Sequence, residues 1–326
     1  MRAKVSAVER MSLWDKMVSL FNRKGAHSAH DEGAARRHTL PLMAYVLSCV
    51  VFGTSPPVVK TALNYYSPSV LLFWCMFIAM LTVMPFALKS IRQVKIKSKK
   101  ELFLLLMLFM CDPVAYFGFE ALAINNATAS QASMAGAVSP MIITFFAWLF
   151  LKERFSRVVW GGLALTVFGV MLLSAVSQVT ETATHPVLGS FFMVLSRCGA
   201  AFFIIILRYF EGRFPLSAII WMQFLVASIF YCPAVINEPA LGLQSTILPL
   251  VLIIYQGAVV TLGGQMLSAY AVSYAPSHMI GILTPVYPLC AVFFSMLIMG
   301  DRLISTQWMA FVLILAGMFI CQRFRK

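Results

Sequence analysis

Residues 139–162 read SPMIITFFAWLFLKERFSRVVWGG, and residues 287–310 read YPLCAVFFSMLIMGDRLISTQWMA. The two segments lie 148 positions apart and agree at a proline, a Phe-Phe pair, an acidic residue followed by Arg, and a tryptophan. The same offset aligns Lys60 with Arg208, Pro85 with Pro233 and Gly169 with Gly317. Matches in this order indicate an internal duplication rather than chance.

The composition indicates a membrane protein. Of the 326 residues, 60% are hydrophobic and 11% are charged, whereas soluble domains have about 45–50% and about 25%. The apolar residues fall in runs of about 20, the length that crosses about 30 Å of hydrocarbon as a helix. These runs cover residues 40–60, 69–89, 101–123, 128–151, 157–177, 187–208, 217–236, 246–272, 277–299 and 304–322. We expect an all-α polytopic membrane protein with ten transmembrane helices.

Basic residues predict the orientation of these helices. Lys and Arg gather before the first run, in every second connection and at the C-terminus, while the other connections hold only Arg302. Because positive charge beside spans is retained inside, both termini are expected in the cytoplasm. The net charge of +13 then reports topology, and no nucleic-acid partner is expected. Residues 1–39 are expected to be a cytoplasmic tail, in which apolar residues at helical spacing leave a short surface helix or a partly disordered segment open.

The duplication divides the spans into residues 40–177 and residues 187–322, with five helices each. Because five is an odd number, the second copy enters the membrane from the opposite side, so the halves form an inverted repeat. In secondary transporters such halves rock around a site near the membrane centre and expose it to each side in turn. The architecture therefore favours transport, and the lack of a nucleotide-binding motif favours a gradient or a partner subunit as the energy source.

Local motifs add a family resemblance. In the first half they are Phe52-Gly53, Lys60, Pro140, Leu151-Lys152-Glu153-Arg154-Phe155, Trp160-Gly161-Gly162 and Gly169; in the second they are Pro288, Met299-Gly300-Asp301-Arg302-Leu303, Trp308 and Gly317. Over residues 40–322 the chain resembles the EamA-type, ten-helix branch of the drug/metabolite transporter superfamily, although Asp301 replaces the usual Glu and no Gly pair follows Trp308. The resemblance implies a basket of helices around a central cavity. It also implies export or exchange of amino acids, related metabolites or drugs, in the inner (plasma) membrane of a bacterium.

Ionisable groups inside the spans are the first site candidates, because a charge in hydrocarbon normally faces a cavity or a partner. Asp112, Tyr116 and Glu120 share one face of the third span by helical spacing, and Pro113 is expected to kink that span toward a cavity. Arg197 lies at a similar depth in the sixth span. We expect a buried Asp112–Arg197 ion pair, which either locks the halves together or opens to bind the ammonium and carboxylate of a zwitterion. Glu120 is either a proton carrier in antiport or a hydrated group near the outer face.

Further candidates are neutral polar residues and prolines. Expected substrate contacts, each alternatively a helix-to-helix hydrogen bond, are Gln131, Gln256, Gln265 and Tyr287. Expected hinges or kinks, besides Pro113, are Pro140, Pro285 and Pro288. Lys60 is expected to reach the outer membrane interface. The repeated tryptophan and glycine (Trp160 and Gly169, Trp308 and Gly317) predict either a helix-packing face or the face of a homodimer.

Other classes of function fit the sequence poorly. An intramembrane enzyme would need a nucleophile, a base or a metal cluster, and the sequence has no HExxH, GxSxG or Walker A motif. The seven cysteines form no CxxC and the five histidines are scattered, so neither a metal site nor a cofactor is expected. A channel would show a continuous polar stripe along several helices. The expected partners are a small-molecule substrate, membrane lipid, and a coupling proton or counter-substrate.

Overall fold

The computed structural model describes residues 39–92, 94, 96, 98–152, 154–177, 180, 183–210, 214–243, 246–275, 279–280 and 283–324. The predicted surface helix of the N-terminal tail lies outside these residues and stays a prediction. Within the described ranges, regular structure is helical apart from one isolated bridge between Thr180 and Ala183.

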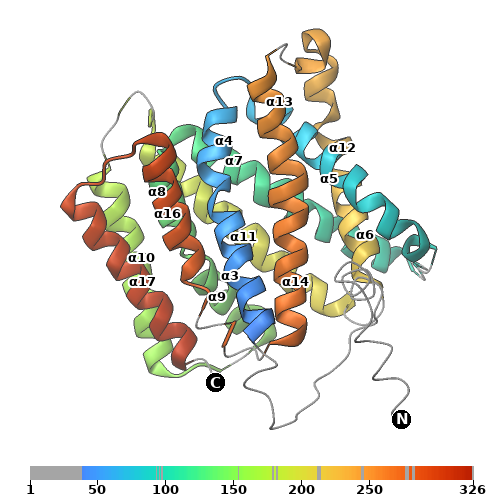
Figure 1. Ribbon diagram of the computed structural model, residues 1–326. Helices are drawn as coiled ribbons and strands as arrows, with labels where there is room; N and C mark the ends of the chain where they lie inside the picture. Colours follow the sequence, from blue (N-terminus) through green and yellow to red (C-terminus); the bar gives the residue numbers. More distant parts are fainter. Residues whose placement is uncertain are drawn as a thin grey trace.

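The first half forms five membrane-crossing units (Figure 1). In chain order these are α3 (Thr39–Gly53) with α4 (Ser55–Ala62); α5 (Pro68–Ile91); α6 (Lys99–Phe109) with the π-helical η1 (Met110–Ala115) and α7 (Tyr116–Asn126); α8 (Ala129–Gly136) with α9 (Ser139–Leu151); and α10 (Arg157–Val176).

The second half repeats this plan. Its units are α11 (Pro186–Phe210); α12 (Leu216–Ile236), followed by the short η2 (Pro239–Gly242); α13 (Ile247–Ile254) with the π-helical η3 (Tyr255–Gly264) and α14 (Gln265–Tyr274); α16 (Val286–Met299); and α17 (Ser305–Phe324). Among the described residues, nine units are long and apolar enough to cross a membrane, and the unit that contains α16 is a shorter apolar helix. The predicted all-helical, ten-helix fold is confirmed.

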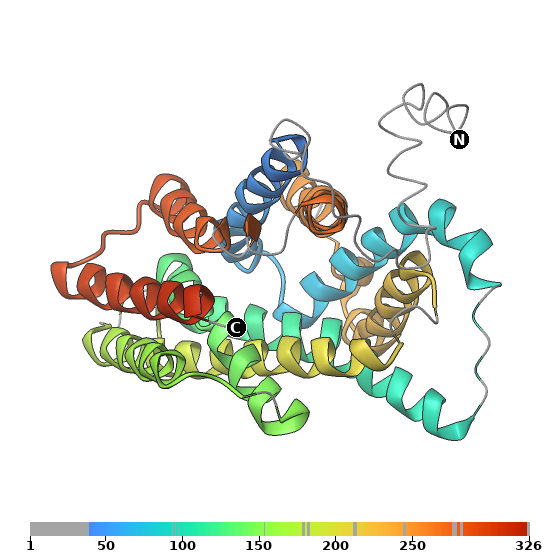
Figure 2. The same ribbon diagram turned by 90° about the horizontal axis from the view of Figure 1, so that it is seen from below.

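Contacts between helices follow the duplication. α5 packs against α12 and α10 packs against α17, so the second and fifth helices of each half contact their own counterparts. Figures 1 and 2 show these two pairs at opposite flanks of the bundle. Between them, α11 packs on α7 and α9, and α3 packs in the corresponding way on α14 and α16. Each half therefore places its first helix against the third and fourth helices of the other half.

Irregular backbone also recurs at matched positions. The π-helical segments η1 and η3 both interrupt the third helix of a half. The fourth helix of each half ends on a left-handed residue, Lys152 (φ 55°) after α9 and Gly300 (φ 69°) after α16. This conformation is common at the residue that follows a helix and costs glycine little. The two residues lie at the 148-residue offset, so the repeat extends to the backbone geometry.

Close approach of α10 and α17 depends on glycine. A Cβ atom on Gly162 would lie 2.9 Å from the Cys321 Sγ and from the Gly317 carbonyl oxygen, and one on Gly169 would lie 3.1 Å from the Ala310 carbonyl oxygen. Small residues at such contacts let helix backbones pack closely in membranes. Of the two predictions for the repeated glycines, helix packing within the chain is the one that these contacts support.

Candidate functional site

A large cavity lies between the two halves. Its volume is about 1320 Å³, and its lining includes residues of α3, α7, α9, α11, η3, α14, α16 and α17. The lining reaches Phe155, just after α9, and Gln322 and Arg323 in the last turn of α17. We call this end of the bundle the basic end, because most of the described Arg and Lys residues at helix ends and in connections gather there (Arg92, Lys99, Lys100, Lys152, Arg154, Arg157 and Arg323), whereas Lys60 and Arg302 lie at the opposite end. The cavity therefore extends from the middle of the bundle to its basic end.

The third helix breaks at the cavity wall. Asp112 has φ −142° and ψ 123°, an extended conformation inside the π-helical segment, and its peptide bond to Pro113 is cis. Backbone groups exposed by such a break need partners, because hydrocarbon supplies none. The Asp112 carbonyl accepts from Gln223 Nε2 at 3.0 Å, and the Val114 carbonyl accepts from the Tyr231 hydroxyl at 2.8 Å. Two side chains of α12 thus stabilise the irregular segment.

Arg197 on α11 forms the centre of a buried polar cluster. Its Nη2 lies 2.6 Å from the Glu120 Oε1 and 3.1 Å from the Met193 Sδ, and its Nη1 donates to the Tyr116 hydroxyl. The guanidinium carbon is also 4.8 Å from the centre of the Tyr116 ring, within cation–π range. The side chains of Arg197 and Glu120 are 4% and 13% exposed. Gly136 makes room for this arrangement, because a Cβ atom there would lie 3.0 Å from Nη2.

The expected Asp112–Arg197 ion pair is wrong. Arg197 pairs with Glu120, and Glu120 is neither unpaired nor a hydrated group of the outer face. The cause is the extended residue: helical spacing holds between Tyr116 and Glu120 inside α7, but it fails across the break at Asp112. Asp112 still lines the same cavity and interacts electrostatically with both Glu120 and Arg197.

The other predicted site residues, which are polar contacts and proline hinges, divide into two groups. Gln256, Gln265, Tyr287, Pro140 and Pro288 all line the cavity. Gln131 does not belong to the lining: it forms a capping box with Thr128 at the start of α8, where its backbone N–H donates to the threonine hydroxyl and its amide oxygen accepts from the threonine N–H. Its interpretation as a substrate contact is therefore replaced by a helix cap. Pro285 is the N-cap residue of α16, at a break between helices rather than in the cavity lining.

Lys60 does not reach the interface as expected. It is 8% exposed, and its Nζ donates to the carbonyl oxygens of Ile124 at 2.7 Å, Asn125 at 3.2 Å and Ala127 at 2.8 Å. These carbonyls belong to the C-terminal end of α7 and the residue after it, where helical partners are lacking and a cation is favoured. The Asp301 Oδ2 accepts from the Ser130 N–H at 3.0 Å in the first turn of α8. Two charged side chains thus hold the α7–α8 connection, at the end of the bundle opposite to the basic end.

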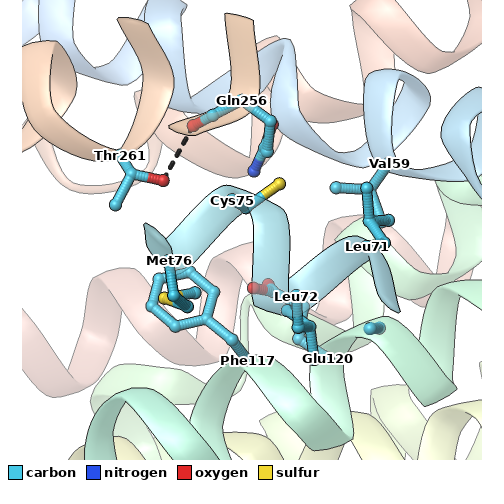
Figure 3. A pocket seen from close by; sticks show the side chains of 10 residues that line it. Val59, Leu71, Leu72, Cys75, Met76, Phe117, Glu120, Gln256 and Thr261 are labelled. Atoms are coloured by element: carbon cyan, nitrogen blue, oxygen red, sulfur yellow. Dashed lines mark hydrogen bonds between the residues drawn. The ribbon is translucent and has the colours of Figure 1, made fainter. Parts of the chain in front are cut away.

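A second, small pocket lies beyond the cavity in that direction (Figure 3). It has a volume of about 20 Å³, enough for about one water molecule. Val59, Leu71, Leu72, Cys75 and Met76 line it, from α4 and the first turns of α5. Four residues line both spaces, and we call them the partition: Phe117, Glu120, Gln256 and Thr261.

Sequence reasoning missed the residues that support the site. Gln223, Tyr231 and Ser196 bind carbonyl groups of the broken third helix, the last with a 2.8 Å bond to the Tyr116 oxygen. Each of these residues has a polar side chain deep inside a span, which is the criterion that selected Gln256 and could have selected these three. Among the described residues, no group of three or more His, Cys, Asp and Glu side chains gathers to hold a metal ion.

Comparison with known proteins assigns the family. The sequence profile of the EamA-like transporter family matches residues 39–175 and again residues 187–322. The chain belongs to the EamA-like transporter family. It is an integral membrane transporter with duplicated halves, and it is similar to two proteins of Bacillus subtilis (strain 168). The uncharacterized transporter YetK is 22% identical over 226 residues, which cover 68% of each chain. The uncharacterized transporter YcxC is 26% identical over 182 residues, 53% of this chain and 58% of the relative.

A solved structure is similar in fold to this EamA-like transporter. It is a crystal structure of a protein with a TM-score of 0.59 and 13% identity, over 87% of this chain and 98% of the other. At this identity the likeness concerns the fold alone.

Proposed function

We propose that this transporter moves a small metabolite, an amino acid or a related compound, by alternating access, and that it works in export or exchange. The observation that carries the proposal is the cavity of about 1320 Å³, which extends to the basic end and contains the Arg197–Glu120 pair and Asp112. Charged groups inside a membrane normally mark a substrate or ion path.

The two ends of the bundle differ in a way that suits alternating access. The cavity extends to the basic end, whereas the small pocket lies on the other side of the partition and the α7–α8 connection there is held by Lys60 and Asp301. We assign the basic end to the cytoplasm of a bacterial cell, following the rule for positive charge. In this conformation the site is accessible from the cytoplasm. The energy comes from a proton or a counter-substrate moving down its own gradient.

Inside-out membrane vesicles test the proposal while the substrate is still unidentified. Vesicles from cells that produce the protein are mixed with a small-molecule extract, and the compounds taken up are identified by mass spectrometry. We expect at least one amino acid or related compound to accumulate with the wild type and not with Arg197→Gln at equal membrane abundance. Trp308→Phe, at a position 41% exposed on the outer surface of α17, is the control and should transport normally. Identical vesicle contents with wild type and Arg197→Gln would contradict the proposal.

A further inference from the structure

One negative charge in the cavity is not balanced. Glu120 and Arg197 neutralise each other at 2.6 Å, whereas the Asp112 carboxylate has no hydrogen-bond or ion-pair partner within the described part of the chain. The hydrogen bond that Asp112 accepts from Gln223 is to its backbone oxygen, and its carboxylate interacts with Glu120 and Arg197 only electrostatically, without a hydrogen bond among the described residues. The other described cation in the lining is Arg323, at the basic end. No hydrogen bond or ion pair joins Asp112 to Arg323 in the described part of the chain.

Arg197 is not free to bind an anion. Both Nη atoms already have partners, and its Nε is buried without one. The side chain is 4% exposed and packs beside Gly136. A substrate carboxylate would have to displace Glu120, which would leave a second buried carboxylate without a counter-ion. Such a displacement is costly, because a buried charge that loses its partner keeps its desolvation penalty.

The remaining wall offers acceptors and apolar surface. Gln256 lines the cavity with 6% exposure, and its Oε1 has no hydrogen-bond partner while its Nε2 donates to the Ser55 hydroxyl at 2.7 Å. Apolar side chains supply much of the rest, among them Phe52, Phe117, Ile143, Phe203 and Val260. Apart from the buried Arg197 Nε, the groups without partners identified on this wall, the Asp112 carboxylate and the Gln256 Oε1, are acceptors. A ligand that complements them carries N–H donors and positive charge on an apolar body.

We propose that the cavity binds an organic cation, an ammonium group on an apolar body, with Asp112 as its counter-ion. This inference rests on the proposed function, because it names the class of substrate for the same cavity. It replaces the zwitterion considered in the sequence analysis. Asp112 still binds the ammonium group, but Arg197 does not bind a substrate carboxylate, because it is already paired with Glu120. In this arrangement the Glu120–Arg197 pair shapes the wall and does not bind the ligand's charge.

Three compounds with one phenyl body and different charges test the assignment. These are phenethylamine (cation), phenylalanine (zwitterion) and hydrocinnamate (anion), each titrated against the purified full-length protein in detergent with intrinsic fluorescence and thermal stability as readouts. We expect phenethylamine to bind most tightly. Asp112→Asn, which preserves the shape of the side chain, should weaken its binding about tenfold or more, through loss of the charge pair. Asn keeps one acceptor oxygen and replaces the other with an NH2 donor, so the substitution removes the charge and one acceptor at nearly constant shape.

The matched control is Gln265→Glu, which adds a carboxylate elsewhere in the lining. In the double variant Asp112→Asn/Gln265→Glu, recovery of phenethylamine binding would show that the cavity recognises charge in general, and we expect only partial recovery. The assignment is overturned if phenethylamine does not bind up to millimolar concentration, if phenylalanine or hydrocinnamate binds more tightly, or if Asp112→Asn binds the amine as well as the wild type does. Binding of the zwitterion or the anion with Arg197-dependent vesicle uptake would leave the proposed transport intact and refute only the cation.

Discussion

The Glu120–Arg197 pair should behave as a coupled unit in unfolding. The perturbation is a double-mutant cycle with methionine, which is apolar and close in length to both side chains: Glu120→Met, Arg197→Met and the double variant. Glu120→Met leaves the Arg197 charge buried beside Tyr116 and Met193, and Arg197→Met leaves Glu120 without its counter-ion. Breaking a buried pair in this way costs about 3–5 kcal/mol. The double variant removes both charges and should regain most of this loss, since apolar replacements of buried pairs are often neutral or stabilising.

The assay is the apparent melting temperature of purified protein in one detergent. A change of 1 kcal/mol shifts the melting temperature by about 2–4 °C in domains of about 150–250 residues, so a loss of about 3–5 kcal/mol should make each single variant melt roughly 6–20 °C below the wild type. The double variant should melt within about 5 °C of the wild type. A control cycle pairs Arg197→Met with Asp112→Met and should be closer to additive. If the Glu120 cycle is additive and the Asp112 cycle is coupled, the sequence-based pairing was right and the reasoning above is refuted.

Two further predictions concern closure and packing. Lys60→Met removes the cation from three carbonyl oxygens at the end of α7 and should lower the free energy of unfolding by about 2–4 kcal/mol, net of the desolvation it relieves. Lys60→Arg should recover part of this stability in the same melting assay. Equal stability of wild type and Lys60→Met would contradict the role given to Lys60. Gly317→Val places a branched side chain against Gly162 and Thr166, so it should separate α10 from α17 and lower the melting temperature or the folded yield. Gly161→Val on the same helix pair, at a glycine with open space around its Cβ position, is the control and should be tolerated.

Hydropathy and the internal repeat predict the fold well, because each span needs about 20 apolar residues to cross the hydrocarbon of the membrane, whichever helices it packs against. The 148-residue offset, found from Pro140 and Pro288 and their neighbours, also relates backbone features that no side-chain pattern predicts. Examples are the left-handed ends at Lys152 and Gly300. The offset is informative because similar sequences adopt similar backbone geometry, including its irregular parts.

The site was predicted less completely, and the errors have physical causes. Spacing of three or four residues places side chains on one face only where the helix is continuous, and the backbone is extended at Asp112. Similar depth in the spans therefore did not bring Asp112 into a pair with Arg197, which contacts Glu120 and Tyr116 instead. For Lys60, the expectation of snorkelling assumed that water was the nearest set of acceptors, whereas the carbonyls at the end of α7 are closer. Gln131 was expected to contact the substrate, but its amide oxygen accepts a hydrogen bond from the Thr128 N–H at the start of α8 instead. In all three cases, a local break or end of a helix determined which partner the side chain has.

The central claim, access to the site from one side at a time, is tested most directly by sided labelling of two cysteines. One variant retains only Cys75, in the small pocket, and another carries only Ser268→Cys, in the cavity lining; all other cysteines are replaced by serine or alanine. A membrane-impermeant maleimide is applied to inside-out and to right-side-out vesicles. Alternating access predicts that Ser268→Cys reacts from the cytoplasmic face and that Cys75 reacts only from the opposite face. It also predicts that Lys60→Met raises the labelling rate of Cys75 and lowers that of Ser268→Cys. Labelling of both positions from the same face, or rates that rise together, would indicate a continuous pore and contradict the account.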